Sequence, residues 1–315
     1  TKLLMDNYIK SLTDLILQGS MENTYKMAWA RALVEICQKD PSPSIHFDQL
    51  SELIFKYYWN QTIFFNLRQG PNLKKPPKIC QIVKESIDQY KKYHGNQPQS
   101  FIRISNKVQV PLNEITTVLK QDVSYRFLKL DKVLNIYEYD LSAALLKIAQ
   151  PDLIASYAEI LYPLINYRWT QKLEDLDGSP RIAQKIRGVD KENTPRRGSL
   201  KKFHSYLDIE NPKRVCFISG EPLEDKNLSV DHVIPWSYLY SDDLWNLVYV
   251  KKGLNSAKSN RLPDEHMINR LEERNIKLNQ LSSNGTKKGK PLGELQIAID
   301  KNYVKRFWND FRMRV

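Results

Sequence analysis

Apolar side chains recur three and four positions apart along the N-terminal part of the chain, which is the spacing of one face of an α-helix. One such run covers residues 4–16, and a second covers residues 21–36 behind Ser20, which offers a helix cap. The two prolines of DPSPS at 40–44 end the second run. The pattern therefore predicts two amphipathic helices in succession.

The following residues continue the helical pattern with one interruption. Residues 47–64 are too densely apolar for a surface helix and predict a buried one, and residues 79–93 predict another helix. Between 101 and 139, FIRIS and LNIYEY alternate like short strands, whereas LNEITTVLKQ has helical spacing. Helical spacing returns over 141–173, with two prolines as breaks. We expect a mainly helical domain over residues 1–175, with a recognition or regulatory role.

The composition changes after this domain. Residues 176–213 are rich in Lys and Arg, including Arg196 and Arg197, and predict a basic linker. Two interpretations remain open: a solvated tether, or an arm that lies along phosphate groups. Residues 266–315 predict a helical extension that ends in one helix over 295–311.

Charge and composition narrow the class of protein. The chain has 48 Lys and Arg against 36 Asp and Glu, a formal net charge of +12, which suggests an anionic partner. Charge alone leaves nucleic acid, acidic lipid and an inert basic surface open as interpretations. Hydrophobic residues make up 41%, too many for a disordered chain. Three widely spaced cysteines exclude a disulfide framework, and no apolar run approaches the roughly 20 residues that cross a bilayer. We therefore expect a cytoplasmic protein with no membrane partner.

The residues that carry candidate chemistry lie between 215 and 263. Asp231 and His232 are adjacent and follow a short strand-like run. Asn246 follows in the apolar LWNLVYV, and Asn255 follows in LNSAKSN. Strand, loop, strand and helix fit this short segment in that order.

The combination of DHVIPWS, WNL and NSAKS over about residues 214–265 resembles the HNH nuclease family of the ββα-metal fold. The spacing is similar to that in the HNH domain of the RNA-guided CRISPR nuclease. The resemblance implies an α+β fold class: a largely helical N-terminal domain, a ββα-metal HNH nuclease core over 214–265 and a C-terminal helical segment. It also implies an endonuclease that hydrolyses DNA phosphodiester bonds with a divalent metal.

By this resemblance, each residue of the motif has a role. His232 is the general base, because an imidazole exchanges protons near neutral pH. Asp231 and Asn255 supply hard oxygen ligands, which suits Mg²⁺ or Mn²⁺. Asn246 supports the loop between the two strands and so holds His232 in register.

Several basic residues are candidates for phosphate contacts in this segment and in the linker, namely Lys251, Lys252, Lys258, Arg261, Arg196 and Arg197. Many HNH domains also carry two CxxC pairs that bind zinc. Here the first pair is Cys216 with Ser219, and no cysteine follows Asn246. We therefore expect no structural zinc, and we expect Trp236 and Trp245 to help to brace the fold.

The order of the domains predicts a biological role. A nuclease module behind a helical domain is typical of a restriction or anti-phage defence effector, which acts as a homodimer or with a partner protein of the defence system. Two other functions stay open: a non-cleaving or partner-activated module that binds nucleic acid, and a nuclease that acts on RNA.

Overall fold

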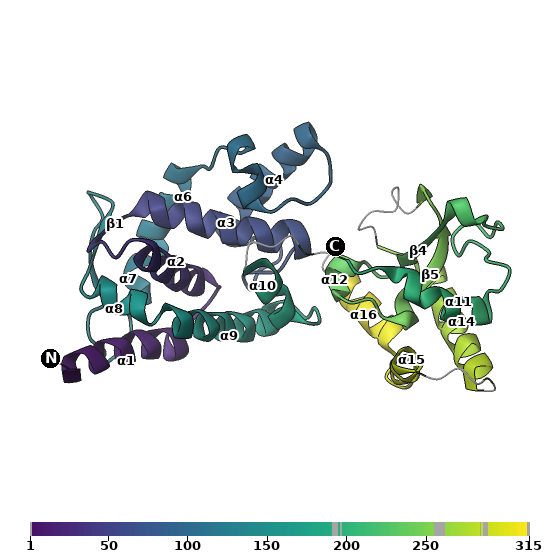
Figure 1. Ribbon diagram of the computed structural model, residues 1–315. Helices are drawn as coiled ribbons and strands as arrows, with labels where there is room; N and C mark the ends of the chain where they lie inside the picture. The colour runs from purple at the N-terminus through teal and green to yellow at the C-terminus, as the bar shows by residue number, and fades with distance from the viewer. Residues whose placement is uncertain are drawn as a thin grey trace. The chain divides into compact units, whose positions relative to one another are not determined.

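The computed structural model describes residues 2–190, 195, 197–254, 262–283, 285 and 289–313; the side chains of 2–6, 189 and 190 are not described. Contacts between Cα atoms divide the chain into two units (Figure 1). Unit 1 comprises Thr1–Gly178 and Ile182–Pro195, and unit 2 comprises Ser179–Arg181 and Arg196–Val315. Each unit is rich in helices and contains a small antiparallel sheet.

Unit 1 has helices with one three-stranded sheet among them. Its elements, in chain order, are α1 (Lys2–Gln18), α2 (Tyr25–Lys39), β1 (Ser44–His46), α3 (Phe47–Phe65), α4 (Lys78–His94), α5 (Phe101–Ile104), η1 (Ser105–Lys107), α6 (Leu112–Asp122), α7 (Ser124–Phe127), β2 (Tyr137–Asp140), β3 (Leu145–Ile148), α8 (Pro151–Ser156), α9 (Ala158–Leu176) and α10 (Ile182–Asp190).

Helix α3 is the centre of unit 1, as its dense apolar sequence predicts. It packs against α2, α4, α6 and α10 (Figure 1). Gln49 accepts a hydrogen bond from the backbone N–H of His46 and so caps its first turn, and Asn66 ends the helix in the left-handed conformation. Indole rings fill the core around it: Trp29, Trp59 and Trp169 are all fully buried. Aromatic burial therefore holds unit 1 together.

Three details of unit 1 differ from the sequence prediction. Residues Phe101–Ile104, expected as a strand, form helix α5. Residues Leu145–Ile148 form strand β3, which pairs with both β1 and β2, although helical spacing continues through them. Helix α2 begins at Tyr25 after Thr24, so Ser20 does not cap it. Strands of three or four residues are too short to outweigh a neighbouring periodic pattern in the sequence.

The segment 176–213, expected as a basic linker, is largely helical. Residues 182–190 form α10, which packs on α3 and α9. Residues Leu200–Phe203 and His204–Glu210 form η2 and α11, and Phe203 and Leu207 enter the core of unit 2. The many lysines and arginines of this segment predicted a basic linker, but the few apolar residues between them determine how its helices pack.

Unit 2 places a two-stranded sheet among helices. After η2 and α11 come η3 (Asp225–Asn227), β4 (Leu228–His232), α12 (Trp236–Leu239), η4 (Leu244–Asn246), β5 (Leu247–Lys251), α14 (Glu265–Ser283), α15 (Lys290–Asp300) and α16 (Tyr303–Arg312).

The C-terminal part of unit 2 consists of three helices that share one core with the sheet. α14 packs on α11 and α15 (Figure 1). α15 also packs against η4. The single helix expected over 295–311 is two helices, because Asn302 adopts the left-handed conformation, with φ 53°, between α15 and α16. Trp308 and Phe311 of α16 are buried in the same core.

Candidate active site

The predicted pair Asp231 and His232 ends the first strand of the sheet in unit 2. β4 and β5 are antiparallel, with Asp231 opposite Val248 and His232 opposite Leu247. Both faces of β4 are largely covered, so Asp231 and His232 are buried, with exposed fractions of 6% and 3%. The strand therefore holds both side chains inside unit 2.

The imidazole of His232 is paired with a carboxylate that the sequence analysis missed. Its Nε2 atom lies 2.9 Å from Oδ1 of Asp242. Because a carboxylate accepts, a neutral ring in this pair carries its proton on Nε2 and its lone pair on Nδ1. Asp242 therefore fixes both the orientation and the tautomer of the ring.

The surroundings of Asp242 favour its charged form. Partial burial alone would raise the pKa of this carboxyl, but the hydrogen bond and charge of His232, the backbone N–H of Gly198 and the charge of Lys202 hold it below its usual value. Asp242 lies in a loop after Tyr240, whose left-handed backbone turns the chain. Its only signal in the sequence is the SDD tripeptide, which has no periodicity that could identify a partner.

Asn246 ties the two ends of the loop together. Its Oδ1 accepts a hydrogen bond from the backbone N–H of Ile234, and its Nδ2 donates to the carbonyl of the same residue, each over 2.8 Å. The backbone N–H of Val233 donates to the carbonyl of Asn246 over 2.9 Å. Since Asn246 is fully buried, these bonds stabilise the chain directly after His232.

Helix α14 adds a second brace. The guanidinium of Arg274 donates to the carbonyls of Leu244, Trp245 and Leu247, and Asn275 donates to the carbonyl of Trp245 over 2.9 Å. Burial lowers the pKa of Arg274 to about 10, so it stays protonated near neutral pH. Neither Arg274 nor Asn275 has a sequence signal that connects it to a loop so far away in the chain.

The two tryptophans expected to brace the fold have different surroundings. Trp245 is 3% exposed and stacks on Phe307, with Tyr303 at its edge, so α16 helps to hold η4. Trp236 is 9% exposed and lies beneath the guanidinium of Arg197, which is 5.3 Å from the ring centroid.

Part of the predicted phosphate-binding set lies in the described residues. Lys251 is near Glu221, with 3.5 Å between Nζ and Oε2, and the Nζ of Lys252 donates to the carbonyl of Lys226 over 2.9 Å. Both lysines are exposed, as is Arg197. Of the other predicted site residues, four lie outside the described residues, namely Arg196, Asn255, Lys258 and Arg261.

Cys216 lies at the place of the first zinc-binding pair of many HNH domains. It is 1% exposed, and the backbone N–H of Ser219 lies 3.5 Å from its Sγ. Burial would raise the pKa of this thiol, but hydrogen bonds from Ser219 and from the backbone N–H groups of Lys251 and Ile218 hold it below the usual value. The turn thus points donors at the sulfur, and Cys216 also belongs to the apolar core.

The predicted metal ligands can be compared with the chemistry of divalent ions. In the described part of the chain, no group of three or more His, Cys, Asp and Glu side chains is arranged to hold a metal ion. Asp231 contributes a carboxylate, and Asn255 would add an amide oxygen. Hard oxygens in small number suit Mg²⁺, which commonly binds one or two carboxylates and completes its shell with water and substrate phosphate. The residue types present therefore fit this ion.

Comparisons with known proteins identify this part of unit 2. Among the described helices, none has the length and apolar character needed to cross a membrane. Searches of curated proteins and of solved structures found no match. Residues 216–264 match the family model of the HNH endonuclease, and this segment contains Asp231, His232, Asp242 and Asn246. Residues 216–264 of this chain therefore form a domain of the HNH endonuclease family.

Proposed function

We propose that this chain is an endonuclease that hydrolyses phosphodiester bonds of DNA with Mg²⁺ or Mn²⁺. The family match supports a nuclease that acts on nucleic acid. The observation that carries the finer proposal is the buried pair of His232 and Asp242 beside the carboxylate of Asp231, because it supplies an oriented base next to an oxygen ligand.

In this proposal, His232 acts as the general base. A water molecule attacks phosphorus in line with the 3′ oxygen, its proton passes to Nδ1 of His232, and the bond from phosphorus to the 3′ oxygen breaks. Asp242 accepts the hydrogen bond from Nε2 throughout and stabilises the imidazolium that forms. Asp242 is therefore a positioning residue, as is Asn246 through the backbone of Ile234.

Asp231 and Asn255 would hold the divalent ion. When bound, the ion neutralises charge on the phosphate and on the leaving oxygen. The carboxylate of Asp231 directly precedes the base in β4, so the strand fixes how far apart the two groups can lie. The ligands and the base are therefore coupled through one short backbone segment.

Substrate contact in this proposal rests on exposed cations. Lys251 is the last residue of β5 and Lys252 follows it, and Arg197 lies over Trp236. Such side chains meet phosphates and position a strand without reading its bases. They favour nucleic acid as the substrate, and the choice of DNA over RNA is part of the proposal.

The biological role that we propose is restriction or anti-phage defence in the cytoplasm. The support is the separation of the chain into a helical unit and a unit with the nuclease domain, which allows recognition and cleavage to be distinct. A single site cuts one strand, so double-strand cleavage would need a homodimer or a partner protein.

Plasmid cleavage tests the proposal. Purified protein is incubated with supercoiled DNA in Mg²⁺, in Mn²⁺ or in EDTA, beside His232→Ala and the matched control His266→Ala, whose imidazole is exposed in the same unit. We expect metal-dependent nicking that His232→Ala abolishes and His266→Ala retains. Cleavage by His232→Ala at the wild-type rate would refute the base assignment. Cleavage of RNA alone would replace DNA as the substrate, and binding without cleavage would favour a binding module.

A further inference from the structure

Unit 1 contains a basic pocket that has no part in the proposed cleavage site. Three segments form it: residues 20–26 before and within the first turn of α2, residues 71–81 before and within α4, and residues 122–129 around α7. The cavity has a volume of about 760 Å³. Sites for small molecules are commonly about 300–1,000 Å³, so the cavity has room for one nucleotide-sized ligand.

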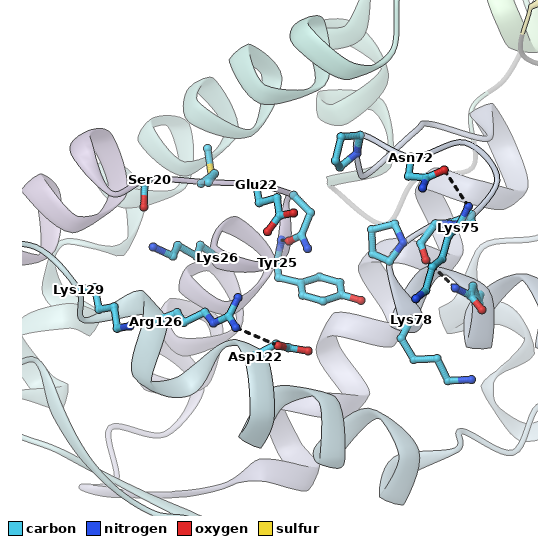
Figure 2. A pocket seen from close by; sticks show the side chains of 16 residues that line it. Ser20, Glu22, Tyr25, Lys26, Asn72, Lys75, Lys78, Asp122, Arg126 and Lys129 are labelled. Carbon is cyan, nitrogen blue, oxygen red and sulfur yellow. Dashed lines mark hydrogen bonds and ion pairs between the residues drawn. The ribbon is translucent and has the colours of Figure 1, made fainter.

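The pocket is lined mainly by cations. In the view of Figure 2, Lys26, Arg126 and Lys129 lie on one side of Tyr25, and Lys75 and Lys78 lie on the other. Two carboxylates, of Glu22 and Asp122, also line the cavity. The lining therefore carries an excess of positive charge on both sides.

Most of these cations have no carboxylate partner among the described residues. Within the part of the chain that the structure describes, the ammonium groups of the four lysines make no ion pair with a carboxylate. Arg126 is 3.5 Å from Asp122, and both side chains are nearly half exposed, so solvent screens that pair. The pocket thus keeps charge available for an anion.

Crowding of like charge is already visible at Lys26. Burial lowers the pKa of this ammonium group, and the charges of Lys129 and Arg126 lower it further. An anion bound between Lys26, Lys129 and Arg126 would attract all three cations and offset the repulsion among them. Structural ion pairs in the same unit look different: Glu35 is within 2.9 Å of both Lys39 and Lys56.

The walls of the pocket are held in place by internal contacts. The backbone N–H of Ile79 donates to the hydroxyl of Tyr25 over 2.8 Å and joins α4 to α2. The Oδ1 of Asn72 accepts hydrogen bonds from the backbone N–H groups of Lys74 and Lys75, and Gln81 donates to the carbonyl of Pro76. The backbone of the pocket walls therefore needs little ordering when a ligand binds.

Gly70 allows the loop to close next to the pocket. A Cβ atom at this position would lie 2.6 Å from Cγ of Pro77, closer than such atoms approach. Pro77 precedes α4, a helix of 17 residues whose N-terminus begins at Lys78 in the lining. The backbone N–H groups of a first helical turn carry partial positive charge, which adds to that of the lysines.

We propose that this pocket binds a phosphorylated ligand of nucleotide size, as a free nucleotide or as the phosphorylated end of a nucleic-acid strand. Cations on two sides suit a ligand with more than one phosphate, or one phosphate followed by a strand backbone. A duplex laid along the surface does not need a cavity. The inference goes beyond the proposed cleavage and holds whether or not unit 2 cuts DNA.

Binding to the full chain in EDTA, where cleavage is prevented, tests the proposal. The probes are ATP and a short single strand of DNA with a 5′ phosphate or a 5′ hydroxyl, and the readout is calorimetry or fluorescence anisotropy. The test variant is Lys26→Gln with Lys78→Gln. The charge-matched control is Lys84→Gln with Lys92→Gln, which removes two exposed cations of α4 that do not line the pocket.

We expect the test variant to weaken binding about tenfold or more and the control to change it less than about twofold. If the test variant loses affinity for ATP only, the ligand is a free nucleotide. If it loses affinity for the DNA strand, and only when the strand carries a 5′ phosphate, the ligand is a strand end. If Lys26→Gln unfolds unit 1, as a thermal melt would show, exposed Lys75→Gln with Lys78→Gln takes its place. The proposal would be overturned if the wild-type chain bound neither ATP nor the DNA strand. It would also be overturned if the test and control variants weakened binding equally.

Discussion

Replacement of Asn246 by alanine tests the central support of the proposed active site. The substitution removes both hydrogen bonds to Ile234 and leaves its backbone N–H and carbonyl buried without their partner. Each buried group that loses its partner costs about 1–3 kcal/mol, so we expect a loss of about 3 kcal/mol in the stability of unit 2. We also expect cleavage per folded molecule to fall, because the backbone that directly follows His232 loses its support.

Asn211 provides a matched control for this experiment. Its amide makes the same two bonds with the backbone of one residue: Nδ2 donates to the carbonyl of Val215 over 2.8 Å, and Oδ1 accepts from the N–H of Val215 over 2.9 Å. This pair is only partly buried, and both residues precede strand β4 and lie outside residues 233–246, the loop that follows His232. Because water can replace the lost partner, Asn211→Ala should cost about 1 kcal/mol or less and leave cleavage unchanged.

Hydrogen exchange read by mass spectrometry localises the effect, since tryptophans in both units would mix their signals in a fluorescence melt. A loss of about 3 kcal/mol lowers the protection of peptides from β4 and β5 by roughly a hundredfold. Cleavage is measured in parallel and normalised to folded protein. Unchanged protection together with wild-type cleavage in Asn246→Ala would show that the loop does not depend on this amide and would refute the reasoning.

Three further predictions address the other parts of the molecule. Asp242→Ala should lower kcat about a hundredfold with little change in KM, and Asp242→Asn should recover part of this loss. The control Asp225→Ala, at an exposed carboxylate of the same unit, should leave kcat unchanged. An unchanged kcat in Asp242→Ala would show that Asp242 has no part in the mechanism. Burial raises the pKa of Glu35, but Lys56, Tyr57 and Lys39 outweigh it and lower the pKa from 4.5 to about 2. The ionised carboxylate of Glu35 therefore contributes about 3 kcal/mol to the free energy of unfolding above the unfolded pKa of 4.5, and this contribution is lost as pH falls towards 2. Urea melts of Glu35→Gln and of the wild-type chain should therefore differ near neutral pH and coincide near pH 2. Replacing Arg196 and Arg197 by alanine should reduce the salt dependence of DNA binding; an equal slope would leave Arg197 with its packing role over Trp236.

Periodicity predicted the long helices of unit 1 because one stripe of apolar residues determines where such a helix packs. The buried helix over 47–64 corresponds to α3, and the helix over 79–93 corresponds to α4. The strand-like pattern over 134–139 predicted part of β2, but the rest of the three-stranded sheet was not predicted, because its pairing joins residues near 45 to residues near 146 across about a hundred positions. Local patterns contain little information about such pairings.

The candidate site was predicted only in part for a related reason. Asp231 and His232 have a local signal, since they end a strand and belong to a family-like block. Asp242 and Arg274 contact this region from a loop and from a distant helix, and a lone Asp or Arg in a charged sequence has many other uses. Their roles depend on burial, which no single sequence reveals at those positions.

The site also depends on more of unit 2 than the matched segment. Arg274 holds the carbonyls around η4 from α14, and Trp245 packs on Phe307 of α16, and both of these partners lie beyond residue 264. Cys216 lies in an apolar core shared with the C-terminal helices. Packing by α14 and α16 therefore braces this region from outside the matched segment. The helices that follow residue 264 are thus part of the packing that holds the hairpin of His232, through Arg274 and Phe307.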